Sequence, residues 1–305
     1  MITAAIDVGS NTLRLIIAEV KDKKIEKIIY DDRKITRLAE GLLKTGELSK
    51  KQIDATIYAL KDFKKYIDIF CPDGSSKIKA IATSAVREAK NSELFINEAA
   101  SIGLNIEVID GKTEGFLTYT GVNAVINLQD ESSLIFDIGG GSTEFIKTDK
   151  GNVKNIVSLP LGVVKIANLY NVNGIVSANI REKITLYIND ILKSLGSDFN
   201  ANLLIGTAGT VTTFAAMDLK MSSYDYKKIN GYILKREKIE LLIDELCALT
   251  AKERLNIKGL EAGREDLVIP GGLIIVEILK RFEKQDLIVS DFGLREGAAI
   301  AASFN

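Results

Sequence analysis

One short phrase occurs twice in this chain of 305 residues, each time between two strand-like segments. Residues 6–16 read IDVGSNTLRLI and residues 136–146 read FDIGGGSTEFI. The copies match position by position, most clearly at Asp7 with Asp137, Gly9 with Gly139 and Thr12 with Ser142. Repetition of a strand-turn-strand unit is typical of a duplicated domain. We therefore expect two related halves that face one another across a cleft, each supplying one glycine turn.

The second copy has the composition of an anion-binding turn. Its three consecutive glycines, 139–141, allow close approach of the backbone, so that successive N–H groups can point at one phosphate. Asp137 and Glu144 stand at the two ends of this turn, and carboxylates beside a phosphate favour a hard divalent cation such as Mg²⁺ between them. A plain hairpin with a solvated glutamate is the alternative, although a tight turn needs only one or two glycines.

Composition excludes several classes of partner. Lys plus Arg (40) balance Asp plus Glu (41), so the chain as a whole has no charge bias toward a nucleic-acid polymer or a membrane. The N-terminus enters a strand almost at once, and no apolar run is long enough to span a bilayer. These features predict a soluble, cytoplasmic protein.

The chain contains no histidine. This excludes Ser-His-Asp triads, imidazole general bases and histidine-ligated zinc. Cys71 and Cys247 are far apart in the sequence and are predicted to be buried free thiols. Any chemistry must then use carboxylates, Arg, Lys, hydroxyls and backbone amides.

The order of the predicted elements favours an α/β fold with mixed sheets flanked by helices. Each half opens with three strands, expected at residues 3–8, 13–20 and 24–31 and again at 133–136, 143–148 and 153–158. Long helices are expected over 49–70, ended by Cys71-Pro72, and over 111–128 and 264–283. We assign an N-terminal domain to residues 1–120 and a C-terminal domain to 121–305, with the last helix, 294–305, able to pack back on the first domain.

Other turns carry weaker signals. Residues 206–211 place glycines and threonines at a helix N-terminus, which favours an anion, although tight strand-helix packing explains such a turn equally well. Arg87 follows a buried strand and Glu114 opens a helix, and the alternative is a surface ion pair or a glutamate in the first turn of a helix. In residues 290–297, Asp291 is expected to cap the following helix.

Together these motifs resemble those of the exopolyphosphatase / guanosine pentaphosphate phosphatase family. The resemblance lies in residues 5–12, 137–144, 206–210 and 291–297, in the right order and over essentially the whole chain. It implies the fold shared by actin, sugar kinases and heat-shock ATPases. Two ribonuclease-H-like (actin-like ATPase) domains would then flank an active-site cleft.

The resemblance also implies roles for individual residues. Glu114 corresponds to the residue that activates the attacking water, and Arg87 to a phosphate clamp. Asp137 and Glu144 correspond to carboxylates associated with Mg²⁺ or another divalent cation, and Asp7 joins them as the match of Asp137. The implied phosphate-binding residues lie in three loops: Gly9, Ser10, Asn11 and Thr12; Gly139, Gly140, Gly141 and Ser142; Gly206, Thr207, Gly209 and Thr210.

The chain departs from the family pattern at three places. Thr113 precedes Glu114 where the family often has a second acid, and Lys165 stands where an arginine is common. The extra C-terminal region of longer members is absent from these residues, which puts a processive grip on long chains in doubt. The tyrosine-containing loop at 224–232 receives no role.

The combined reading predicts a Mg²⁺-dependent hydrolase that releases terminal orthophosphate from inorganic polyphosphate, from guanosine pentaphosphate, or from both. Positioning and charge neutralisation supply most of such catalysis, and without histidine Glu114 is the best candidate for the base. Two alternatives stay open: a small-molecule kinase of the same superfold, and an actin-like ATPase acting in assembly. Dimerisation of two copies also stays open.

Overall fold

The computed structural model describes residues 1–71 and 77–304 and divides into two compact units. Unit 1 comprises Met1–Ala124 and Phe292–Asn305, and unit 2 comprises Val125–Asp291. Pro72, expected to end a helix, and Asn305, the end of the last predicted helix, lie outside the described residues. The chain thus leaves unit 1 once and returns to it for its final helix.

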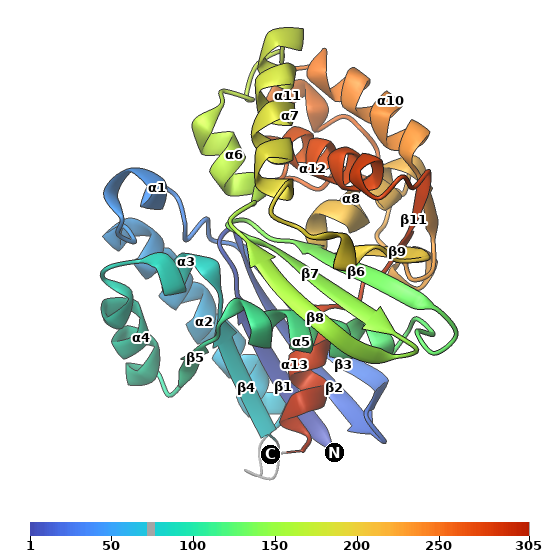
Figure 1. Ribbon diagram of the computed structural model, residues 1–305. Coiled ribbons are helices and arrows are strands. Elements are labelled where there is room, and N and C mark those ends of the chain that lie inside the picture. Colours follow the sequence, from blue (N-terminus) through green and yellow to red (C-terminus); the bar gives the residue numbers. More distant parts are fainter. Residues whose placement is uncertain (72–76, 305) are drawn as a thin grey trace. The chain divides into compact units, whose positions relative to one another are not determined.

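The described residues of unit 1 form a five-stranded sheet in the order β3-β2-β1-β4-β5 (Figure 1). Its strands are β1 (Ile2–Val8), β2 (Thr12–Lys21), β3 (Lys24–Ile35), β4 (Lys77–Ala82) and β5 (Ile106–Val108). The first three are antiparallel neighbours, whereas β4 and β5 run parallel to β1. The predicted opening meander is confirmed, and so is the mixed character of the sheet.

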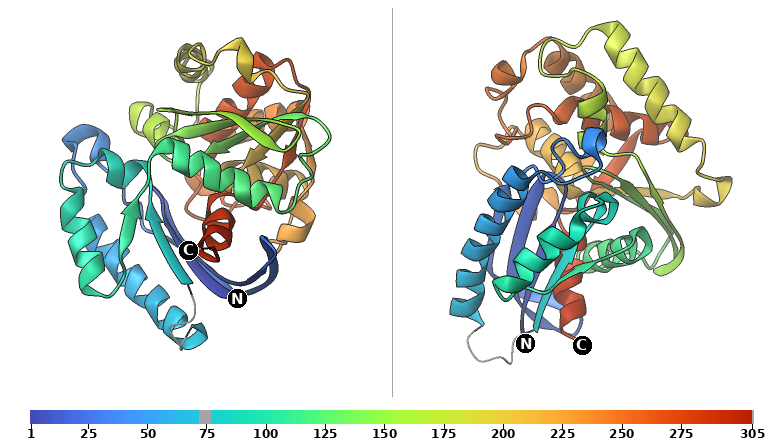
Figure 2. Two further views of the ribbon diagram at one scale, coloured as in Figure 1. Left: turned by 60° about the horizontal axis from the view of Figure 1, so that its bottom comes forward. Right: turned by 90° about the vertical axis from the view of Figure 1, so that its left-hand side faces the viewer.

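Helices cover both faces of this sheet because alternate strand residues are apolar on each side. Ala4 and Ile6 of β1 pack in the cluster that includes α2 (Lys50–Phe70) and α4 (Ser92–Ser101). Ala5 faces the other way, into the cluster formed with α5 (Gly111–Asn123) and α13 (Leu294–Ala302). Figure 2 shows α13, in red, beside the blue strands.

Helix α2 begins as predicted, because the Ser49 side chain accepts a hydrogen bond from the Gln52 N–H at 3.3 Å. Helix α5 is shorter than predicted and ends at Asn123. Close contact between α5 and α13 depends on Gly297, where an added Cβ atom would lie 1.8 Å from the Leu117 carbonyl oxygen. Only a residue without a side chain allows the two backbones to approach this closely.

Unit 2 repeats the same layout. Its described residues form a six-stranded sheet in the order β10-β11-β9-β6-β7-β8. The strands are β6 (Ser132–Ile138), β7 (Thr143–Asp149), β8 (Asn152–Leu159), β9 (Leu203–Thr207), β10 (Ile233–Lys235) and β11 (Asp286–Val289). As in unit 1, three antiparallel strands are followed by parallel neighbours, here β9 and β11, on the other side of the first strand, and unit 2 adds the antiparallel strand β10 at that edge. The duplication predicted from the repeated phrase is therefore present in the topology.

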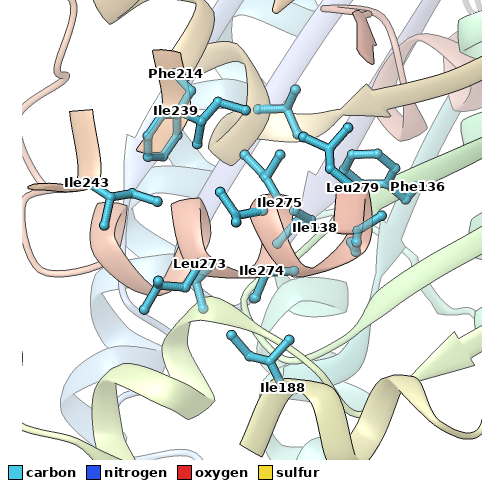
Figure 3. Packing of buried hydrophobic residues seen from close by; sticks show 14 of the residues in the cluster. Phe136, Ile138, Ile188, Phe214, Ile239, Ile243, Leu273, Ile274, Ile275 and Leu279 are labelled. Atoms are coloured by element: carbon cyan, nitrogen blue, oxygen red, sulfur yellow. The ribbon is translucent and has the colours of Figure 1, made fainter. Parts of the chain in front are cut away.

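The core of unit 2 centres on α12 (Val268–Arg281), which is buried along most of its length. Its side chains, including Leu273, Ile275 and Leu279, lie among apolar side chains from β6, α7 (Ala178–Leu192), α8 (Ala208–Asp218) and α10 (Arg236–Cys247) (Figure 3). This helix begins later than predicted because residues 264–267 form turns instead.

Both cysteines are free thiols, as predicted. Cys247 is buried, and burial raises the pKa of its thiol, whereas Cys71 is only half-buried. Across the described ranges, no helix combines the length and the apolar character needed to cross a membrane.

Candidate active site

Strand register gathers the candidate residues of unit 1 at one edge of its sheet. The parallel strands β1, β4 and β5 end together, with Val8, Ala82 and Val108 in register. The segments that follow these strands carry the predicted site residues, as expected for ligand-binding loops at the carboxyl ends of an open sheet. Ser10 and Ser84 meet there, with their hydroxyl oxygens 3.0 Å apart.

The turn between β1 and β2 is closed by a hydrogen bond from the Gly9 N–H to the Thr12 carbonyl, 3.1 Å long. The carbonyl groups of this turn accept hydrogen bonds from the segment after β3. The Ser10 oxygen lies 2.9 Å from the Ala39 nitrogen, and the Asn11 oxygen lies 3.1 Å from the Thr36 nitrogen. Within the described ranges, the N–H groups of Ser10 and Asn11 donate to no acceptor. Successive unused N–H groups in a turn form a concavity suited to an anion.

The turn between β6 and β7 has the same construction. Gly139 donates to the Ser142 carbonyl at 2.9 Å, and the Gly140 carbonyl accepts from the Val164 N–H at 2.9 Å, at the start of α6 (Val163–Leu169). The N–H groups of residues 140–142 donate to no described acceptor. Lys165, the predicted departure from the family pattern, also approaches this turn, with its N–H 3.3 Å from the Gly140 oxygen.

Arg87 and Glu114 form an ion pair in unit 1. Arg87 lies in α3 (Ser84–Glu88), and its Nη1 donates to Glu114 Oε2 at 3.2 Å and to the Ile109 carbonyl at 2.7 Å. The ion pair is partly buried, because the Glu114 side chain is 8% exposed and the Arg87 side chain 27% exposed, and Glu114 lies in the first turn of α5, as one of the alternatives predicted. In the part of the chain that the structure describes, Nε and Nη2 of Arg87 make no hydrogen bond. These nitrogens therefore keep donor capacity for a phosphate.

Helix α5 is fixed at its start by Asp110, which sequence reasoning missed. The Asp110 carboxylate accepts from the Thr113 N–H at 2.8 Å, so it caps the helix one turn before Glu114. This backbone hydrogen bond, together with the Thr113 hydroxyl and with Arg87 nearby, lowers the pKa of Asp110. An aspartate three residues before Thr113 was the available signal.

Carboxylates of unit 2 stand side by side across the sheet. Asp137 on β6 is paired in register with Glu144 on β7 and, on its other side, with Thr207 on β9. Glu144 is fully buried and Asp137 is 7% exposed. Ser158 on β8 donates to Glu144 Oε1 at 2.7 Å, a contact that only the strand pairing reveals.

The corresponding pair in unit 1 differs in charge. Asp7 lies opposite Arg14 in the β1–β2 register, at the position that Glu144 occupies opposite Asp137. The candidate metal ligand Asp7 thus has a cationic neighbour across the sheet.

The residues of unit 2 suit a divalent cation that is bound by one or two carboxylates better than a cation that is enclosed by protein ligands alone. No group of three or more acidic, histidine or cysteine side chains gathers in the described ranges to hold a metal ion. Mg²⁺ commonly binds through one or two carboxylates, with water and substrate phosphates completing its shell. Asp137 and Glu144, paired in register on neighbouring strands, match that pattern.

The third candidate loop follows β9 at the carboxyl edge of unit 2. Ala208, at its centre, has a backbone φ of 68°, a left-handed conformation that is costly for a residue with a Cβ atom. The side chain of Arg264 lies against Gly209, where an added Cβ would be 2.2 Å from Nη2. Strain of this kind accumulates where a loop must hold a particular shape.

The predicted cap of the last helix is wrong. Gly293, rather than Asp291, is the N-cap of α13, and its N–H donates to Glu296 Oε2 at 2.9 Å. Glu296 also accepts from Arg295 Nε at 2.7 Å. Asp291 instead accepts a hydrogen bond from the hydroxyl of Tyr224. Arg295 and Glu296 therefore stabilise the start of α13.

Comparison with known proteins assigns the chain to a family. The profile of the Ppx/GppA phosphatase family matches residues 16–302. The chain belongs to that family. A crystal structure of the Aquifex aeolicus family member is 32% identical, covers 100% of this chain and 98% of its own, and superposes with a TM-score of 0.83. The two-domain actin-like fold expected from the motifs is thus confirmed.

Curated relatives of the Ppx/GppA family carry phosphatase names. A bifunctional 3-dehydroquinate synthase/phosphatase of Fusobacterium nucleatum is 34% identical over 94% of this chain, and the chain spans 44% of that relative's length. Exopolyphosphatase 2 of Mycobacterium tuberculosis is 28% identical, with 98% of this chain and 97% of its own length covered.

Proposed function

We propose that this Ppx/GppA family member hydrolyses the terminal phosphoanhydride of inorganic polyphosphate and releases orthophosphate. The observation that carries the proposal is the pair of matching glycine turns with unused backbone N–H groups, together with the Arg87–Glu114 pair beside the first turn. A chain of phosphates presents the repeated anionic groups that such turns bind. The name of the mycobacterial relative, exopolyphosphatase 2, agrees with this substrate.

Binding and charge neutralisation fall to the turns and to Arg87. The amides of residues 10–11 and 140–142 hold phosphate oxygens, and the spare guanidinium nitrogens of Arg87 contact the terminal phosphate. Residues 206–210 add further amides and hydroxyls. Fixed donors of this kind stabilise charge that develops on the phosphoryl oxygens during transfer.

Glu114 is the general base of the proposed reaction. Its carboxylate takes a proton from water as the water oxygen forms a bond to the terminal phosphorus. The bond from that phosphorus to the bridging oxygen breaks, and the bridging oxygen leaves as the new end of the shortened chain. The ion pair with Arg87 orients the carboxylate before substrate arrives.

Asp137 and Glu144 would hold Mg²⁺ or another divalent cation in unit 2, and Asp7 is a separate candidate ligand in unit 1. When bound, the cation neutralises charge on phosphate oxygens. The Ser158 hydroxyl orients Glu144 for that task through its 2.7 Å hydrogen bond.

Orthophosphate release from long-chain polyphosphate with Mg²⁺ tests the proposal. Glu114→Gln should lower kcat by about 10²- to 10⁴-fold, because a general base contributes that range. Glu107→Gln is the matched control, since Glu107 is an exposed glutamate of the same unit that pairs with Lys79. Equal turnover of Glu114→Gln and wild-type protein would refute the role of Glu114.

Guanosine pentaphosphate and ATP serve as parallel substrates in the same assay. Release from guanosine pentaphosphate would extend the substrate class to nucleotide polyphosphates. ATP consumption that depends on a second acceptor would instead support a kinase. In a Mg²⁺ titration, Asp137→Asn should raise the half-saturating concentration, whereas Asp149→Asn, at the far end of β7, should not.

A further inference from the structure

Arg254 is a fully buried arginine of unit 2 for which the proposed reaction has no use. It ends the short helix α11 (Ala251–Arg254), and its guanidinium forms no ion pair with any described carboxylate. It donates only to backbone carbonyl groups: from Nε to Leu246 at 2.9 Å, from Nη1 to Val172 at 2.6 Å and to Glu265 at 2.9 Å, and from Nη2 to Gly174 at 2.7 Å. These bonds offset the cost of taking the guanidinium out of water.

The four carbonyl groups belong to three segments that are distant in the sequence. Val172 and Gly174 lie in the loop between α6 and α7, and Leu246 lies at the end of α10. Glu265 lies in the turns that lead into α12. Arg254 therefore fixes the segment before α12 to two other parts of unit 2.

The segment before α12 and the start of α12 pack against the loop of residues 206–210. The Arg264 guanidinium lies so close to Gly209 that an added Cβ would be 2.2 Å from Nη2. At the start of α12, a Cβ on Gly271 would be 2.4 Å from the Thr210 methyl carbon. Contacts this close limit the shapes that the loop can adopt.

The position of Arg264 depends on the local structure of its own segment. Its Nε donates to Glu261 Oε2 at 3.0 Å, and the Glu265 carboxylate accepts from the Gly263 N–H at 2.6 Å. The Glu265 carbonyl is held by Arg254. Arg254 thus fixes the backbone directly next to Arg264.

The loop of residues 206–210 requires contacts of this kind, because its backbone is strained. Ala208 has a φ of 68°, and such a conformation persists only where the surrounding structure holds it. The two residues after Ala208 are the ones that contact Arg264 and the start of α12. A residue that fixes the segment before α12 therefore also supports the strained loop.

We propose that Arg254 is a positioning residue for the loop of residues 206–210. It keeps the segment before α12 against this loop, so that the loop retains the shape in which it binds phosphate. Arg254 itself touches no substrate, because it is fully buried. This inference rests on the proposed function, which assigns phosphate binding to the loop, and adds to it a residue from outside the loop.

Hydrogen exchange read by mass spectrometry tests the positioning role without a ligand. Arg254→Lys should speed exchange at residues 206–212 by about threefold to thirtyfold, because one ammonium group replaces a guanidinium that reaches three segments. Phe199→Ala is the matched control, since Phe199 is buried before the opposite end of β9. It should lower Tm but change exchange at 206–212 by less than about twofold. Unchanged exchange at 206–212 in Arg254→Lys would overturn the inference.

The wild-type protein provides a test that needs no variant. In native-state exchange with rising urea, the amides of residues 206–212 and 264–268 should open with one common free energy and one common urea slope. Separate openings of the two segments would show that the segment before α12 does not hold the loop.

Binding of sodium tripolyphosphate to the full chain in the Glu114→Gln background connects the positioning role with function. Calorimetry should show that Arg254→Lys raises Kd by about threefold to thirtyfold and that Phe199→Ala changes it by less than about twofold. Gly209→Ala displaces the Arg264 guanidinium, so its effect on Kd should not be additive with that of Arg254→Lys. Additive effects, or an unchanged Kd in Arg254→Lys, would overturn the inference. If the Glu114→Gln parent binds no tripolyphosphate, the proposed function fails, and the exchange rates decide the positioning role by themselves.

Discussion

Ala208 is a residue at which the backbone departs from what its side chain prefers. Its φ of 68° brings Cβ too close to the following carbonyl, which costs roughly 1–2 kcal/mol. The position begins α8, directly after the β9 residue that lies beside Asp137. Strain held at such a point indicates that the shape of the 206–210 loop is required rather than incidental.

Ala208→Gly should stabilise the protein by about 0.5–1 kcal/mol, because relief of the left-handed strain exceeds the extra entropy of glycine in the unfolded chain. Ala216→Gly in the same helix is the matched control and should destabilise by about 1 kcal/mol. Guanidinium unfolding midpoints measure both. Equal losses in the two variants would mean that Ala208 is not strained.

At the scale of elements, the start of α5 decides where Glu114 stands. Asp110 holds the first turn by accepting from the Thr113 N–H, and Arg87 holds the carboxylate of Glu114 from α3. The helix start, rather than the length of the helix, is thus what positions the proposed base. Its end at Asn123 instead of the predicted Leu128 leaves that geometry untouched.

Asp110→Ala should lower Tm by a few degrees at pH 7, and the difference should become smaller in acid. The Thr113 hydrogen bonds lower the pKa of Asp110 below its ordinary value of 3.8. The part of the cap's contribution that depends on the charge of Asp110 is therefore fully present above that value and is lost as pH falls through the lower pKa of the folded state. Asp110→Asn keeps the acceptor and should retain most of the stability at pH 7. A gap between wild type and Asp110→Ala that persists unchanged at pH 2 would contradict this account.

At the scale of the whole molecule, the duplication could be predicted from the sequence because the residues of each hairpin lie close together in the chain. The glycine turns and the Asp137–Glu144 pair follow from residues close together in the chain. The contacts of Ser84 with Ser10 and of Ser158 with Glu144 could not be predicted, because they depend on the pairing of strands that are distant in the sequence. The three-residue strand β10 is too short to show the alternation of apolar and polar residues that marks a strand. The N-cap of α13 is Gly293 and not the predicted Asp291, because Glu296 accepts the hydrogen bond of the Gly293 N–H.

Fragments of unit 1 that lack its final helix, α13, are expected to be less stable, because the chain returns to unit 1 for that helix. Helix α13 buries Leu294 and Ile300 against the sheet of unit 1, and each buried aliphatic side chain contributes about 1.5–3 kcal/mol. The two together contribute about 3–6 kcal/mol, a large share of the about 5–15 kcal/mol that stabilises a whole domain. A fragment of residues 1–124 should therefore fail to unfold cooperatively.

Joining residues 1–124 to 292–304 through a short Gly/Ser linker should restore a cooperative transition. The linker can be short because the two ends meet, with the Gly293 oxygen 2.0 Å from where a Cβ on Gly121 would lie. The same joined fragment with Gly297→Leu is the matched control. It should not fold, since its side chain would collide with the Leu117 carbonyl. Circular dichroism during urea unfolding distinguishes these cases, and a cooperative transition in 1–124 alone would show that α13 is dispensable to unit 1.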